Sequence, residues 1–110
     1  MLYSFLPPES IDDSRLSFWQ SHTWKRILED SHQAEEVFYF GNTDGTFFLV
    51  EIRTLKLGML GAFVLGPNTV QIQSDFSLCI NALKVELRKK GIVLLQVEPT
   101  DDTGMIASGL

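Results

Sequence analysis

Glu98 is the side chain best placed to do chemistry, because it ends an apolar run and directly precedes a proline. The run 92–97 predicts a strand, and the proline stops it. An earlier apolar run, 61–65, ends at Gly66-Pro67. A carboxylate at such a strand end can orient a substrate amine or accept its proton. The alternative role for Glu98 is to cap local amide groups before Pro99.

An amphipathic helix must connect these two strands. Apolar residues recur with helical spacing at Phe76, Cys79, Ile80, Leu83 and Leu87. Asp75 is suited to cap the start of this helix, and Gly91 is suited to follow its end. Strand, helix and strand in this order predict a right-handed parallel crossover, which sets the ends of the two strands side by side. Ligands of open α/β sheets bind beyond such ends.

The preceding residues predict a helix and three antiparallel strands. Ser21 is expected to cap the helix, which ends near His32. The strands are expected at 36–41, 46–55 and 59–65, with turns at 42–45 and 56–58. The predicted fold class is α+β, with a mixed sheet and the order helix, strand, strand, strand, helix, strand. Strand 92–97 is nearly all apolar, so it is expected to be covered on both faces.

The chain divides into three parts on this interpretation. Residues 1–20 are expected to form an irregular lead, 21–99 a domain, and 100–110 a flexible tail. A length of 110 residues allows one small domain or a piece of a larger protein. The lead has neither the basic flank of a signal peptide nor the length of a membrane span, so the cytoplasm is the expected compartment.

Charge and composition exclude several classes of function. The formal net charge of −5 does not suit a dedicated nucleic-acid binder. Cys79 is the only cysteine, which excludes an internal disulfide and a cysteine-based zinc site. His22 and His32 do not share metal-ligand spacing with acidic residues, and no metal or cofactor is expected. The basic residues near 84–90 indicate either complementation of a helix dipole or a patch for an anion.

Four segments resemble the FemA/FemB/FemX family of peptidoglycan-bridge aminoacyltransferases. The segments, in chain order, are Phe18-Trp19-Gln20-Ser21 with Trp24 and Lys25-Arg26, then Phe47 to Ile52, then Phe63 to Pro67, and Leu94 to Pro99. They span about three-quarters of the chain in the order in which the family has them. Members of this family are similar to GNAT-type acyltransferases and contain two such domains. The chain resembles the first half of the first domain, so we expect it to be inactive alone.

The resemblance implies a reaction and a set of binding residues. The reaction is transfer of an amino acid from aminoacyl-tRNA to an amine of a peptidoglycan precursor. Positioning of the reactants and stabilisation of the oxyanion supply much of the catalysis, without a protein nucleophile. The substrate-binding residues implied are Lys25, Arg26, Gly66, Gln96 and Glu98. The chain departs from the family at Leu65 and Gln96, where members commonly carry a basic residue.

Two other classes of function stay open. One is a GNAT-type small-molecule acyltransferase that binds acyl-coenzyme A, although residues 68–71 lack the glycines that let backbone amides approach a pyrophosphate. The other is a non-enzymatic interaction domain, for example a homodimer that covers an exposed sheet edge.

Overall fold

The computed structural model describes residues 3–14, 16–42, 46–66 and 76–98. These residues form an α+β fold of two α-helices and a five-stranded mixed sheet. The strands are β1 (Ser4–Leu6), β2 (Glu36–Gly41), β3 (Phe47–Thr54), β4 (Leu60–Leu65) and β5 (Ile92–Glu98). The helices are α1 (His22–Ser31) and α2 (Phe76–Lys89), and short 3₁₀ helices η1 (Pro8–Ser10), η2 (Phe18–Gln20) and η3 (Lys56–Gly58) complete the elements.

The sheet follows the chain, in the spatial order β1-β2-β3-β4-β5. The first three pairings are antiparallel, and β4 pairs with β5 in parallel through the α2 crossover. This confirms the expected mixed sheet and the parallel crossover unit. A register shift near Leu60 and Gly61 places an extra residue in β5, at Val93, which lies between the residues paired with them.

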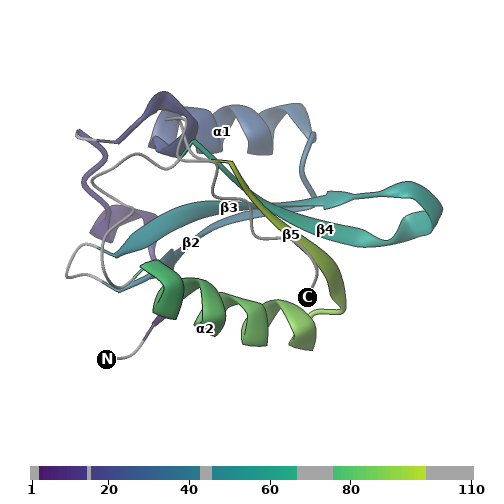
Figure 1. Cartoon of the computed structure of the whole chain (residues 1–110). Coiled ribbons are helices and arrows are strands. Elements are labelled where there is room, and N and C mark those ends of the chain that lie inside the picture. Colours follow the sequence, from purple (N-terminus) through teal and green to yellow (C-terminus); the bar gives the residue numbers. More distant parts are fainter. Residues whose placement is uncertain (1–2, 15, 43–45, 67–75, 99–110) are drawn as a thin grey trace.

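Each helix covers a different face of the sheet, so the elements form three layers (Figure 1). The larger core lies between the sheet and α2, where Phe48, Val50 and Ile52 of β3 meet the apolar stripe of the helix. The smaller core lies on the α1 face, around Tyr39 and Leu49. Alternate residues of β3 therefore serve different cores, as the period of two in a strand requires.

Local signals that the sequence predicted are present at the ends of both helices. The hydroxyl of Ser21 accepts a hydrogen bond from the backbone N–H of Trp24, which caps α1. His32 ends that helix in the left-handed conformation. Gly91 has φ 77° after α2, a conformation that glycine adopts without strain. The expected cap Asp75 lies outside the described residues, as do the turn residues 43–45 and the tail 100–110.

Two expectations about the strands were wrong. The lead 1–20 contains β1, which pairs with β2 and adds a strand before the expected order. A three-residue strand is too short to show a pattern in the sequence, and its partner lies more than thirty residues away. Strand β5 is not covered on both faces, because α2 buries one face and the residues on the other are only partly covered. Leu95 and Val97 are buried against α2, whereas Val93 and Glu98 are exposed.

Candidate functional site

The ends of β4 and β5 lie side by side, as the sequence predicted. The backbone N–H of Gly66 donates to the carbonyl of Glu98 at 2.6 Å, one step beyond the pairing of Leu65 with Glu98. Gly66 has φ 70°, so the chain leaves β4 there in a conformation that favours glycine. The two strands thus stay hydrogen bonded to their last residues. Pro67 and Pro99, the prolines of the two strand exits, lie outside the described residues.

Glu98 is exposed at this end, and Gln96 lies beside it. The side-chain amide of Gln96 donates from Nε2 to Oε1 of Glu98 at 2.5 Å. Both residues project on the α1 side of the sheet, because alternate residues of β5 are buried against α2. This carboxylate is accessible to a ligand, and a neutral amide holds one of its oxygens.

A buried glutamine connects this site to the helical side of the molecule. Gln20 donates from Nε2 to the carbonyl of Leu65 at 2.8 Å, and its Oε1 accepts from the backbone N–H of Leu49 at 2.8 Å. The hydroxyl of Tyr39 donates to the Gln20 carbonyl at 2.9 Å. Ser17 Oγ donates to the carbonyl of Gly66 at 2.5 Å. The segment around Gln20 is therefore fixed directly against the end of β4.

The same hydrogen bonds bring the resembling segments together in space. Gln20 belongs to the first segment, Leu49 to the second and Leu65 to the third. The fourth segment is β5, which pairs with the third residue by residue up to Glu98. Gln20 lies within one of the resembling motifs, but that motif predicts no role for it. A glutamine beside two aromatic residues does not indicate burial in the sequence. Only the tertiary contacts show that Gln20 is buried while Phe18 and Trp19 are exposed.

A buried ion pair lies further along the same sheet face. Glu51 of β3 is almost fully buried, and its carboxylate accepts from Trp24 Nε1 at 3.3 Å and from the guanidinium of Arg53. The Arg53 guanidinium carbon lies 5.2 Å from the ring centre of Phe63. Trp24 also contacts Trp19, with ring centres 4.9 Å apart. The hydrogen bond from Trp24 to Glu51 holds α1 against the sheet. The Arg53 side chain remains partly exposed to solvent.

Lys25 and Arg26 are not part of the strand-end site in the described structure. Lys25 forms an ion pair with Glu29, with Nζ and Oε2 at 3.0 Å, one turn along α1. Arg26 is exposed on the same helix. No described hydrogen bond or ion pair connects either residue to Gly66, Gln96 or Glu98. The structure therefore brings together three of the five residues that the resemblance implied.

Burial raises the pKa of two groups whose types can act as nucleophile or acid, Cys79 and Tyr39. Burial raises the pKa of the Cys79 thiol to about 12, so it stays protonated at neutral pH. Burial, assisted by the charge of Asp13, raises the pKa of the Tyr39 hydroxyl, which stays a donor to Gln20. Neither group is poised for nucleophilic chemistry. Cys79 is a buried core residue, as its position in the sequence predicted.

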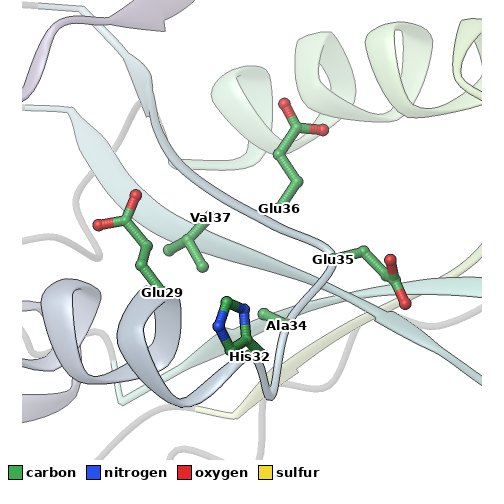
Figure 2. A pocket seen from close by; sticks show the side chains of 6 residues that line it. All are labelled: Glu29, His32, Ala34, Glu35, Glu36 and Val37. Atoms are coloured by element: carbon green, nitrogen blue, oxygen red, sulfur yellow. The ribbon is translucent and has the colours of Figure 1, made fainter.

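A pocket of about 340 Å³ lies elsewhere, between the end of α1 and the start of β2 (Figure 2). It is lined by Glu29, His32, Ala34, Glu35, Glu36 and Val37. The side chains of its three glutamates point in different directions in Figure 2.

Each pocket carboxylate has a partner within the described residues. Lys25 pairs with Glu29, Thr54 Oγ1 donates to Glu35 at 2.7 Å, and Lys90 pairs with Glu36 at 3.3 Å. Among the described residues, no group of three or more histidine, cysteine or acidic side chains could hold a metal ion.

Within the described residues, no helix has the length and apolar character needed to cross a membrane. Comparisons with protein-family models, with curated proteins and with solved structures find no match to this chain.

Proposed function

We propose that this chain is the N-terminal part of a FemAB-type aminoacyltransferase with a GNAT-like fold. The observation that carries the proposal is the convergence of the four resembling segments at the end of β4 through Gln20 and the β4–β5 pairing. Three of these segments lie on the neighbouring strands β3, β4 and β5, and the buried Gln20 adds the first segment to them. The antiparallel strands followed by a parallel crossover are consistent with this half-domain.

In this proposal the strand-end site holds the amine of a peptidoglycan precursor. Glu98 accepts the amine proton, and the amine nitrogen attacks the ester carbonyl of aminoacyl-tRNA. The new amide bond forms as the ester bond breaks, and the proton passes to the ribose oxygen that leaves. Gln96 orients the carboxylate of Glu98, and Gly66 fixes the neighbouring strand end. Lys25 and Arg26 of α1 are assigned no part in this step, because no described hydrogen bond or ion pair connects them to the strand-end site.

The test is a titration of the ¹⁵N-labelled chain with UDP-MurNAc-pentapeptide, followed by NMR. The expected result is a set of chemical-shift changes centred on Gly66, Gln96 and Glu98, which the variant Glu98→Gln weakens. Uridine diphosphate alone serves as the control for binding through the nucleotide only. A well-dispersed spectrum in which none of these amides moves, at the highest precursor concentration, would contradict the assignment of precursor binding to this site.

The same fold gives less support to a transferase that uses acyl-coenzyme A. It requires backbone amides that approach a pyrophosphate, and the expected loop, 68–71, lies outside the described residues and lacks glycine. The strand ends of β4 and β5 also stay hydrogen bonded up to Gly66 and Glu98. No room opens between these strands for a ligand to enter.

The exposed edge of β5 supports a second proposal, that of a homodimer. β5 has a neighbour in the described sheet on one side only, and a free edge invites pairing with another strand. The extra residue at Val93 interrupts one end of that edge. Light scattering during size-exclusion chromatography gives the test, since a monomer at every concentration would contradict this proposal.

A further inference from the structure

The turn between β3 and β4 carries a leucine in an unusual conformation. Leu57 has φ 64° and ψ 23°, in the left-handed region, within η3. Its side chain is 96% exposed. A backbone hydrogen bond closes this turn: the N–H of Leu55 donates to the carbonyl of Met59 at 2.6 Å. We call residues 56–59 the hairpin tip.

Folding alone does not favour leucine at this position. The left-handed conformation is strained for a residue with a branched side chain, and glycine, asparagine or aspartate would adopt it at lower cost. Full exposure also leaves the apolar side chain of Leu57 in water, which gains nothing from burial. Gly58, with φ 75°, follows immediately, so the turn holds two consecutive residues in the left-handed region and only the second is a glycine. Local strain combined with exposed apolar surface points to a contact made outside this domain.

Exposed apolar side chains lie near the hairpin tip, and basic side chains lie in the last turn of α2. Met59 is 45% exposed, and Val93 at the start of β5 is 47% exposed. In the parallel pairing Leu60 lies opposite Ile92 and Gly61 opposite Leu94, so Val93 lies further along the sheet than Met59 and is not its partner. The β3–β4 hairpin extends beyond the C-terminal end of α2 and the beginning of β5 (Figure 1). The end of α2 adjoins the start of β5 through Gly91 and carries Arg88 and Lys89.

Charges of both signs lie near this end of the sheet. Lys89 pairs with Glu86 at 3.0 Å, Lys90 pairs with Glu36 at 3.3 Å, and Glu35 accepts a hydrogen bond from Thr54 at 2.7 Å. Lys56, within the hairpin tip, and Arg88, in the last turn of α2, have no ion pair among the described residues. These two cations are therefore available to an anionic partner, although the formal charge of the whole chain is −5.

We propose that the hairpin tip docks onto an anionic lipid surface. A bilayer places an apolar interior beneath a negatively charged layer, and a convex apolar tip followed by cations matches that order of layers. A second copy of the chain across a two-fold axis at the tip would bring the same cations face to face. A flat lipid surface can also receive a convex tip without a groove of complementary shape. The contact adds to the proposed transferase function without resting on it.

The experiment is co-sedimentation of the chain with lipid vesicles. Vesicles of phosphatidylcholine are compared with vesicles of phosphatidylcholine and phosphatidylglycerol in equal parts, at low and at high salt. Leu57→Asn keeps the left-handed turn and removes the apolar side chain, and Leu78→Asn removes a leucine that is 59% exposed on the outer side of α2. A third variant, Lys56→Glu with Arg88→Glu, tests the cations. Thermal unfolding of every variant confirms that each is folded.

The wild-type chain is expected to bind the mixed vesicles, and less so at high salt. Leu57→Asn is expected to lower binding by about tenfold, the factor for removing one leucine side chain from an apolar layer. Leu78→Asn is expected to bind as the wild type does, and the charge variant is expected to lose binding. The proposal is overturned if the wild-type chain does not sediment with either kind of vesicle. It is also overturned if Leu57→Asn and Leu78→Asn lower the bound fraction equally. Self-association in vesicle-free samples, abolished by Leu57→Asn, would assign the tip to a second copy instead.

Discussion

Replacing Gln20 by leucine tests whether one buried side chain holds the helical side of the molecule to the strand-end site. The leucine has nearly the same volume, so it removes the hydrogen bonds of the Gln20 side chain, two of which are 2.8 Å long, without opening a large cavity. The carbonyl of Leu65 and the N–H of Leu49 then lack the partners that Gln20 supplies. A buried polar group left without a partner costs about 1–3 kcal/mol. The sum for two such groups is about 2–6 kcal/mol, a large share of the ~5–15 kcal/mol that holds a typical domain folded.

The assay is urea denaturation, followed by tryptophan fluorescence and by circular dichroism. Trp19 directly precedes Gln20 and contacts the ring of Trp24, so both tryptophans report on the same region. Gln96→Leu is the matched control, because Gln96 is only half-buried and its amide contacts an exposed carboxylate. That control is expected to change the free energy of unfolding by no more than ~0.5 kcal/mol. A loss below ~1 kcal/mol for Gln20→Leu, or equal losses for both variants, would refute the reasoning.

Two further predictions concern buried charge and pH. Arg53→Ala leaves the buried Glu51 carboxylate with the Trp24 N–H as its remaining described side-chain partner, and because Arg53 is more than a third exposed we expect a loss of only about 1–2 kcal/mol. Equilibrium unfolding measures this loss, and an unchanged midpoint would mean that solvent already screens the pair. The pKa values of Cys79 and Tyr39 are both raised by burial, so the folded state holds their protons more tightly than the unfolded state does. Stability is therefore fully present below the ordinary thiol pKa of 9.0 and falls as pH rises above it, by about 1.4 kcal/mol per pH unit for each group that titrates only when unfolded. Chemical denaturation at a series of alkaline pH values measures this slope, and Cys79→Ala should flatten its first part; a slope unaffected by that variant would contradict the assignment.

The sequence by itself determined the elements whose signals are local. The period of two in β3 and the period of 3.6 in α2 follow from which faces must be apolar, and the structure has both. The cap at Ser21, the end of α1 near His32 and the turn at 56–58 are also local, because each depends on residues within one turn. The parallel crossover followed from element order alone. These signals sufficed to place Gly66 and Glu98 side by side.

The tertiary structure decided what depends on contacts distant in the sequence. β1 exists because β2 offers it an edge, and three residues carry no period of their own. The position of β5 at the edge of the described sheet depends on which strands pair with it. An apolar run in the sequence carries no information about those partners. Gln20 and Glu51 are buried because other segments cover them, and their hydrogen bonds span 45 and 27 residues. The strain at Leu57 is likewise invisible in the sequence, because backbone dihedral angles are fixed only once the hairpin closes around it.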